Sequence, residues 1–318
     1  MQNVNKRQAM IYIILPCYNE ELVVAESARL LLGYLDTLPF ECRLLFVDDG
    51  STDATWKCIS ELHDRYPSRV EALRLSCNEG QQVATLAGLE ACVDKADAII
   101  SMDVDLQDDM TVIPRMVTDC REGYDVVYGV KRSRKRDIMW KRVTASLFYR
   151  TMKLMGCDLV AGHSECRLLS KRAAQALLSC PERNLFVRCL VTRLGFDSKS
   201  EYYDLQPRMA GRSKYSVAKL TGLALDGITN FSVRPIRWIM MLGVLCILVA
   251  LPVVVWVLVN WYQGKTSLGW PSLLISLWVL GGLQIFVTGV VGEYIAKIYT
   301  EVKRRPRYFV RDRLERSE

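Results

Sequence analysis

The chain has 318 residues, of which 50% are hydrophobic and 24% charged, and its net charge at pH 7 is +7. This length fits one catalytic domain with a smaller module attached. The 11 cysteines have no CxxC spacing and only two histidines are present, so a disulfide framework, a cysteine zinc site and a multi-histidine metal centre are not expected. No stacking platform accompanies the basic residues, which argues against a nucleic-acid partner.

The first 130 residues alternate short apolar runs with amphipathic patterns. The apolar runs are rich in Val, Ile and Leu and predict buried parallel strands at 10–16, 42–49, 70–76, 97–103 and 125–130. The segments between them predict helices at 20–36, 53–66, 80–93 and 110–122. This alternation predicts an α/β fold with a Rossmann-like, doubly wound sheet. The polar start MQNVNKRQAM has no signal-peptide pattern, so the domain is expected in the cytoplasm.

Acidic residues gather where the predicted strands end, and ligands bind beyond the carboxyl ends of the strands in such sheets. The segment after the first strand reads PCYNE, residues 16–20, and the second strand runs into Asp48-Asp49-Gly50-Ser51. We predict that Asp48 and Asp49 accept hydrogen bonds from the base and ribose of a nucleotide. The plainer alternative for this segment is a turn followed by a helix N-cap.

The segment MDVDLQDD, residues 102–109, follows the fourth predicted strand. An extended chain puts alternate residues on one side, so Asp103, Asp105 and Gln107 are predicted to face the same way. Oxygen ligands of this kind suit Mg²⁺ or Mn²⁺. A divalent ion here would neutralise a diphosphate and ease its departure as a leaving group. A coincidental acidic loop is the alternative.

The sequence becomes predominantly apolar in its last third. Residues 216–236 predict an amphipathic helix at a membrane surface. Uncharged stretches predict two transmembrane helices at about 238–260 and 271–294, each supplying the roughly 20 apolar residues that a bilayer crossing needs. Basic residues flank this pair on its outer sides, which predicts that both termini lie in the cytoplasm. The expected organisation is a catalytic domain at 1–215, an interfacial region at 216–236, a hairpin at 237–297 and a basic tail at 298–318.

Two basic clusters precede the predicted hairpin. The run KRSRKR is expected near the membrane, where its first residues, Lys131 and Arg132, would help to receive a lipid phosphate. A second cluster combines three cations and a hydroxyl, a set suited to a diphosphate or a phosphate monoester: Arg208, Arg212, Ser213 and Lys214. Solvated loops are the alternative for both clusters.

These motifs together resemble the family-2 glycosyltransferases that load sugars onto polyprenyl phosphate, a group that includes bactoprenol glucosyltransferases and, more distantly, dolichol-phosphate mannose synthase. The resemblance runs from about residue 10 to residue 310. It rests on the segments LPCYNEE (15–21), VDDGSTDAT (47–55), NEGQQVATLAGLEAC (78–92), MDVDLQDD, RMAGRSKYSVAKL (208–220) and GEYIAKIYTEVKRRPRYFV (292–310). The last of these is typical of the membrane-anchored bacterial branch.

The resemblance implies a GT-A fold, a nucleotide-sugar donor, a bound Mg²⁺ or Mn²⁺, and transfer with inversion at the anomeric carbon. It assigns nucleotide-sugar contacts to Pro16, Tyr18, Glu20, Asp48, Asp49 and Asp103. It assigns the metal to Asp103, Asp105 and Gln107, and the phosphates to the cluster at Arg208, Arg212, Ser213 and Lys214. It also implies a homo-oligomer, with a tetramer as the expected form.

The segment HSECRL, residues 163–168, departs from the family pattern. The family has an aspartate followed by an aromatic residue before Arg-Leu, and here Glu165 and Cys166 take those places. Glu165 keeps the carboxylate on a longer stem and is a candidate general base. A lipid phosphate, with a second pKa of about 6, needs little deprotonation at pH 7. Glu165 is therefore equally a candidate for orienting Arg167 or the sugar hydroxyls.

The predicted function is transfer of a hexose from a UDP-sugar, foremost UDP-glucose, to undecaprenyl phosphate, feeding cell-envelope glycosylation at the bacterial inner membrane. The catalytic residues are predicted to be Asp105, Glu165 and Arg167. The alternatives are another sugar (N-acetylglucosamine, mannose or a modified arabinose), a processive polysaccharide synthase, and a degenerate membrane scaffold. The RxxRW pattern at 234–238 resembles a motif of such synthases, but no further membrane helices are predicted that could form a polymer channel, so we interpret it as an interfacial anchor.

Overall fold

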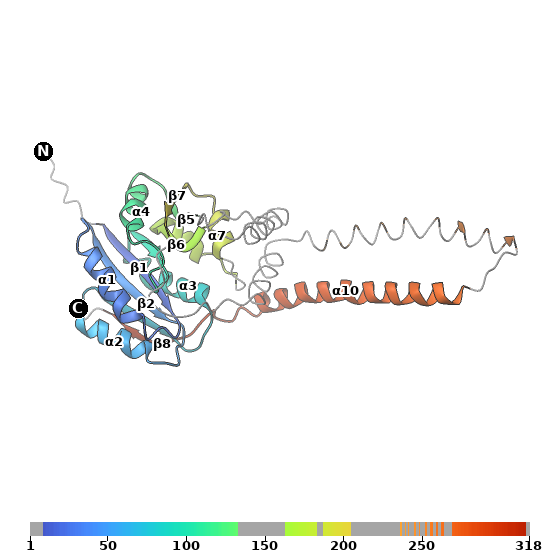
Figure 1. Cartoon of the computed structure of the whole chain (residues 1–318), viewed down its shortest axis with the longest axis horizontal. Helices are drawn as coiled ribbons and strands as arrows, with labels where there is room; N and C mark the ends of the chain where they lie inside the picture. The colour runs from blue at the N-terminus through green and yellow to red at the C-terminus, as the bar shows by residue number, and fades with distance from the viewer. Residues whose placement is uncertain are drawn as a thin grey trace. The chain divides into compact units, whose positions relative to one another are not determined.

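The computed structural model describes residues 9–132, 163–182, 187–204 and 269–315, together with isolated positions between 236 and 263. The chain forms two compact units. The first comprises Met1–Tyr149, Asp158–Val217 and Arg305–Glu318, and the second comprises Arg150–Cys157 and Ala218–Arg304. Figure 1 shows the elements of both units.

The first unit is built on one sheet, which has eight strands within the described residues, in the order β7-β5-β6-β4-β1-β2-β3-β8. Five strands come from the first part of the chain: β1 (Met10–Cys17), β2 (Glu41–Asp48), β3 (Val70–Leu75), β4 (Ala98–Ser101) and β5 (Val126–Lys131). The others are β6 (His163–Ser170), β7 (Ser198–Tyr203) and β8 (Val310–Leu314). The five strands predicted from apolar runs are therefore confirmed to within two residues.

The sheet is mixed, which corrects the expectation of parallel pairing throughout. Strands β1 to β4 form a parallel block, because β1 pairs in parallel with both β2 and β4, and β2 with β3. Strand β6 lies antiparallel between β4 and β5, and β5 pairs in parallel with β7. An apolar run shows that a strand is buried but not which strand lies beside it. The predicted run at 125–130 is thus separated from the parallel block by a segment from later in the chain.

Helices cover both faces of the sheet. On one face, α1 (Val24–Leu35), α2 (Thr55–Arg65) and α4 (Val112–Arg121) share a core with alternate residues of β1. This follows from sequence periodicity: Ala28, Leu31 and Leu35 recur at helical spacing, whereas Ile11 and Ile13 alternate along the strand. Helix α3 (Gln81–Cys92) packs on the other face, where a side chain at Gly88 would meet Ile14. Two further helices are α6 (Lys171–Leu178) and α7 (Val187–Arg193).

The C-terminal residues return to the sheet of the first unit. The segment predicted as part of a basic tail contains β8, which pairs antiparallel with β3 at the edge of the sheet. The Tyr308 hydroxyl donates to Glu90 at 2.6 Å, and the Ser76 amide donates to the Phe309 carbonyl at 2.8 Å. The strand reads VRDRL and is mostly exposed, as edge strands often are. Because most of its residues are charged, a search for apolar runs does not predict this strand.

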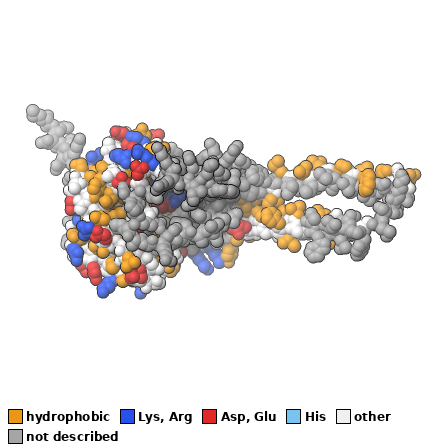
Figure 2. Space-filling view, viewed as in Figure 1, with side chains coloured by type: hydrophobic (Ala, Val, Ile, Leu, Met, Phe, Trp, Pro, Cys, Tyr) orange, Lys and Arg blue, Asp and Glu red, His pale blue; other side chains and the backbone are white. Residues whose placement is uncertain are grey.

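In the second unit, α10 (Trp270–Val302) is a 33-residue helix, with hydrophobic side chains exposed along it (Figure 2). At 1.5 Å per residue, such a helix is about 50 Å long. No helix in the described part of the chain combines the length and the apolar composition that a bilayer crossing requires. The predicted span at 271–294 falls within α10. The predicted helices at 216–236 and 238–260 lie mostly outside the described residues.

Gly50 offers a test of how the loop after β2 is packed. Its φ is +66°, and a Cβ at this position would lie 2.6 Å from the Cys77 carbonyl carbon and 2.8 Å from the Asn78 amide nitrogen. We expect Gly50→Ala to lower the free energy of unfolding by more than about 1 kcal/mol, measured by urea unfolding of the full chain. Gly33→Ala is the control, because a Cβ there meets nothing within 4 Å in helix α1. A Gly50→Ala protein as stable as the control would contradict this packing.

Candidate active site

The loops after β1 and β2 are joined by hydrogen bonds from both sides. The Asn19 amide donates to the Ser51 hydroxyl at 2.9 Å, and the Asn19 side-chain oxygen accepts from the Thr52 amide at 2.9 Å. The Glu20 amide donates to the Thr55 hydroxyl at 2.8 Å. Asn19 has a φ of 53°, a conformation that asparagine tolerates better than most residues. The two strand ends therefore present a single cross-linked rim.

Asp48 and Asp49 hold this rim from within the protein. Asp48 is fully buried, and its Oδ1 accepts from the Ser51 amide at 3.0 Å. The Asp49 carboxylate accepts from the amides of Glu79 and Gly80, at 2.8 and 2.9 Å. Burial raises the pKa of Asp49, while these two amides oppose that shift. Both carboxylates thus organise backbone at the site, and their contact with a nucleotide stays a prediction.

Arg74 on β3 neutralises Asp48. Its Nε lies 3.2 Å from Asp48 Oδ2, its Nη2 donates to the Ser51 carbonyl at 3.4 Å, and its guanidinium lies over the Trp56 ring at 5.6 Å. Its Nη1 also lies 3.7 Å from the Asp312 carboxylate on β8. One arginine therefore connects the loop after β2 with the C-terminal edge strand.

The segment after β4 exposes its polar side chains in part but is not extended as the DxD spacing predicts. Asp103, Asp105 and Gln107 are partly exposed, whereas the intervening Val104 and Leu106 are buried. The backbone turns between Asp103 and Leu106, and Leu106 has a φ of 48°, which bulky side chains rarely adopt. The three predicted metal ligands are therefore all accessible, and their binding of a metal stays a prediction.

The carboxylates near Asp103 repel one another, and burial adds to the free-energy cost of ionising Asp103. Burial, followed by the charges of Asp108, Glu165 and Asp105, raises the pKa of Asp103 to about 7. Gln81 at the start of α3 donates to Asp103 Oδ1 at 2.5 Å. A cation beside Asp103 would relieve the repulsion between these carboxylates, because an opposite charge favours the ionised form.

A divalent cation fits this arrangement as an ion shared with a substrate. Among the described residues, no group of three or more His, Cys, Asp or Glu side chains could hold a metal by itself. Mg²⁺ in nucleotide enzymes is usually bound through one or two carboxylates together with substrate phosphates. Asp103 and Asp105, both partly exposed, would be those two carboxylates, and Gln107 would add an amide oxygen.

Asp108 lies beneath this segment. It is fully buried, forms an ion pair with Lys131 at 3.2 Å, and accepts a short hydrogen bond from the Tyr203 hydroxyl. Burial, followed by the charge of Asp108, raises the pKa of Tyr203 well above its usual range, so the phenol stays protonated and donates. Lys131, predicted to meet a lipid phosphate, is thus already paired with Asp108, and that predicted contact stays a prediction.

Glu165 on β6 lies between two arginines. Its Oε2 accepts from Arg167 Nη2, and its Oε1 accepts from both Arg188 Nη2 and Arg188 Nε, at 2.6 and 2.9 Å. The Ser101 hydroxyl, at the end of β4, donates to the Glu165 carbonyl at 2.7 Å. The partnership with Arg167 was foreseen as one role for Glu165. Both carboxylate oxygens are therefore engaged by guanidinium groups.

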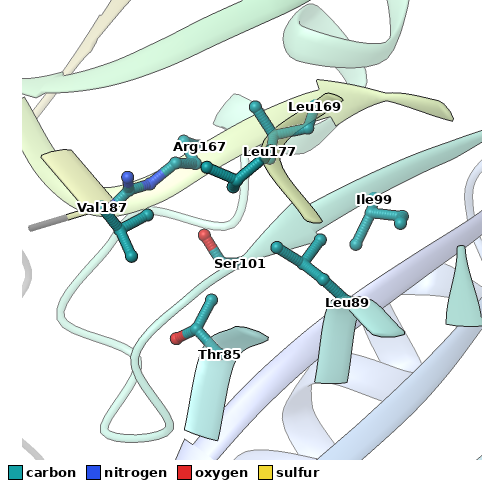
Figure 3. A pocket seen from close by; sticks show the side chains of 8 residues that line it. All are labelled: Thr85, Leu89, Ile99, Ser101, Arg167, Leu169, Leu177 and Val187. Atoms are coloured by element: carbon teal, nitrogen blue, oxygen red, sulfur yellow. The ribbon is translucent and has the colours of Figure 1, made fainter. Parts of the chain in front are cut away.

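Arg167 is itself almost completely buried, with 2% of its surface exposed. It lines a cavity with about 230 Å³ of empty volume, part of which is open solvent, formed by residues of α3, β4, β6, α6 and α7. Its side chain runs along this cavity toward Val187 (Figure 3). Among the described residues, its Nε and Nη1 have no hydrogen-bond partner. Arg167 therefore binds the Glu165 carboxylate but is almost inaccessible to solvent.

The remaining predicted residues are spread along the rim or lie outside the described part. Pro16 belongs to β1, Tyr18 is 37% exposed, and Glu20 is partly exposed. Arg132 is exposed and lies 3.7 Å from Asp204. The phosphate cluster lies outside the described residues: Arg208, Arg212, Ser213 and Lys214.

Sequence reasoning missed three charged residues that organise the site. Asp108 was inside the quoted MDVDLQDD motif but had no assigned role. Arg74 carried a weak signal, since it is a cation near the end of an otherwise buried strand. Arg188 carried none, because its partner Glu165 is 23 residues away in the sequence.

Comparison with known proteins identifies the family. The model of glycosyl transferase family 2 matches residues 12–178. The chain belongs to glycosyl transferase family 2. It is 42% identical to the uncharacterized glycosyltransferase YkoT of Bacillus subtilis (strain 168), over 96% of this chain and 93% of that protein. It is 34% identical to a bactoprenol glucosyl transferase of Shigella phage SfX, over 95% of this chain and 99% of that protein.

The chain is therefore a glycosyltransferase, as its motifs predict. Its mixed α/β sheet is of the GT-A type. Among solved structures, the glucosyl-3-phosphoglycerate synthase of Mycobacterium tuberculosis is 19% identical, with a TM-score of 0.45 over 70% of this chain and 79% of that chain. A likeness this distant carries no argument about substrate or metal.

The pairing of Arg74 with Asp48 predicts a specific loss of stability. In Arg74→Met the fully buried Asp48 loses its ion-pair partner, and we expect unfolding to become easier by about 2–4 kcal/mol, slightly less than for a wholly buried pair because Arg74 is partly exposed. Urea unfolding of the full chain measures this change. Arg29→Ala removes an exposed pair with Glu26 and should leave the curve unmoved. Equal unfolding curves for the two variants would refute the role of Arg74.

Proposed function

We propose that this glycosyltransferase moves glucose from UDP-glucose to a polyprenyl phosphate, of the undecaprenyl kind, with inversion at the anomeric carbon. The observation that carries the proposal is the 34% identity with bactoprenol glucosyl transferases, which extends over 95% of the chain. That similarity continues well beyond residue 178, where the family-2 match ends. The C-terminal part, which a soluble acceptor would not require, is therefore included in the likeness.

The proposed reaction exchanges one phosphate oxygen for another at the anomeric carbon. The bond from that carbon to the donor diphosphate breaks, UDP leaves with the electron pair, and an oxygen of the lipid phosphate forms the new bond. Asp103, Asp105 and Gln107 would hold Mg²⁺ or Mn²⁺, an ion that would neutralise the charge of the leaving diphosphate. The protein contributes by fixing the donor and acceptor in line.

The arrangement around Glu165 favours orientation over proton abstraction. A phosphate monoester has a second pKa of about 6 and is largely ionised at pH 7, so it attacks without giving up a proton first. Glu165 has both oxygens on guanidinium groups. With its oxygens held in this way, the Glu165 carboxylate would orient the sugar hydroxyls instead of removing a proton.

We further propose that the enzyme acts at the cytoplasmic face of the bacterial inner membrane. The support is the sequence: uncharged stretches near 238–260 and 271–294, aromatic residues in the connecting loop, and basic residues on the outer flanks. Assembly into a homo-oligomer, with a tetramer as the expected form, stays a prediction.

The reaction is tested with the purified full chain, undecaprenyl phosphate and a panel of nucleotide sugars, with the glycolipid identified by mass. UDP-glucose is expected to give a lipid carrying one hexose. Transfer of another sugar would show that the donor is not UDP-glucose. Formation of a polymer would favour the synthase alternative. Absence of transfer and of donor hydrolysis with every donor would favour the scaffold alternative.

The metal-binding segment is tested by substitution within it. Asp105→Ala should reduce transfer by on the order of 100-fold or more, because stabilisation of the leaving diphosphate would be lost. Asp109→Ala is the control from the same segment, since the Asp109 carboxylate accepts from the Thr111 amide. A near-normal rate in Asp105→Ala would remove Asp105 from the metal site.

A further inference from the structure

Arg188 has a geometry that is unusual for a surface arginine. Its Nε and Nη2 both donate to the same oxygen of Glu165, at 2.9 and 2.6 Å, while Arg167 donates to the other oxygen. The three side chains differ in exposure: the side chain of Arg167 is 3% exposed, that of Glu165 18% and that of Arg188 31%. Arg188 thus closes the outer side of a cluster whose inner side is Arg167.

The helix that carries Arg188 is anchored beside the metal-binding segment. Helix α7 buries Val187, Cys189 and Leu190, so the intervening Arg188 is directed away from that apolar contact. The Val187 amide donates to the Gln82 side-chain oxygen at 2.8 Å. The preceding residue, Gln81, donates to Asp103 at 2.5 Å. Two consecutive glutamines at the start of α3 therefore fix both α7 and the first metal-ligand candidate.

Glu165 is tied to the same segment by its backbone. The Ser101 hydroxyl donates to the Glu165 carbonyl, and Ser101 precedes Asp103 by two residues. The backbone of Glu165 is thereby set, but its flexible side chain still has several rotamers available. Arg167 reaches one carboxylate oxygen from the buried side. A second, two-point contact from Arg188 selects one orientation of the carboxylate.

We propose that Arg188 is a positioning residue for sugar transfer, acting through Glu165 to hold its carboxylate in one orientation beside the segment that follows β4. The inference rests on the proposed function. Without Arg188, the Glu165 carboxylate would lose this two-point contact close to the Asp103 carboxylate. Loss of fixed geometry near the reacting atoms lowers the rate of the chemical step more than the affinity for the donor.

The test is a double-mutant cycle measured by glucosyl transfer to undecaprenyl phosphate, with wild type, Arg188→Ala, Glu165→Gln and the double variant. We expect Arg188→Ala to lower kcat by about 10–100-fold, the scale typical of residues that orient a functional group, with the KM for UDP-glucose changed by less than about 3-fold. In the Glu165→Gln background, Arg188→Ala should lower kcat by less than about 3-fold, because the side chain through which Arg188 acts is already altered. Arg188→Lys should recover part of the rate, since it keeps the charge but not the two-point contact.

Two controls separate this role from a general loss of structure. Arg193→Ala changes an exposed arginine on the same helix and should retain the wild-type rate. An unchanged KM for UDP-glucose in Arg188→Ala indicates that the donor site remains folded.

Each other outcome counts against the inference. Additive losses in the double variant would mean that Arg188 acts independently of Glu165, for example on a substrate phosphate. A wild-type rate in Arg188→Ala or in Glu165→Gln would make the pair dispensable. A wild-type protein that transfers no sugar to the lipid overturns the proposed function itself, a result distinguishable from an active wild type with additive variants.

Discussion

The organisation of this site depends on keeping several carboxylates close together near the carboxyl ends of the parallel strands. Burying an ionised carboxylate is costly unless cations or hydrogen-bond donors compensate it. Four of these acids have such compensation: Arg74 for Asp48, backbone amides for Asp49, Lys131 and Tyr203 for Asp108, and two arginines for Glu165. Many of these partners are distant from the acids in the sequence, so this cluster of compensated carboxylates exists only in the folded protein.

The degree of burial divides these acids by role. Asp48 and Asp108 have no exposed surface and hold loops in place. Asp103 and Asp105 are partly exposed, and the raised pKa of Asp103 reflects both burial and the neighbouring negative charges. The excess charge therefore remains at the rim, where a cation and a diphosphate can be accommodated together.

Much of this architecture follows from sequence patterns that act locally. The Val- and Ile-rich runs fixed the first five strands, and the period-2 spacing of Asp103, Asp105 and Gln107 agrees with their common exposure. The features that were missed depend on contacts between distant residues. β6 enters between β4 and β5, β8 joins β3 from the far end of the chain, and Arg188 meets Glu165 from another element. Local periodicity carries no information about such pairings.

We propose that a divalent cation, shared with a nucleotide diphosphate, completes the site around Asp103 and Asp105. Calorimetric titration of UDP into the metal-stripped full chain, with and without Mn²⁺, is the decisive measurement. We expect strong binding only when Mn²⁺ is present, and its reversal by a chelator. Equal affinity for UDP with and without a divalent cation would show that no such cation is shared.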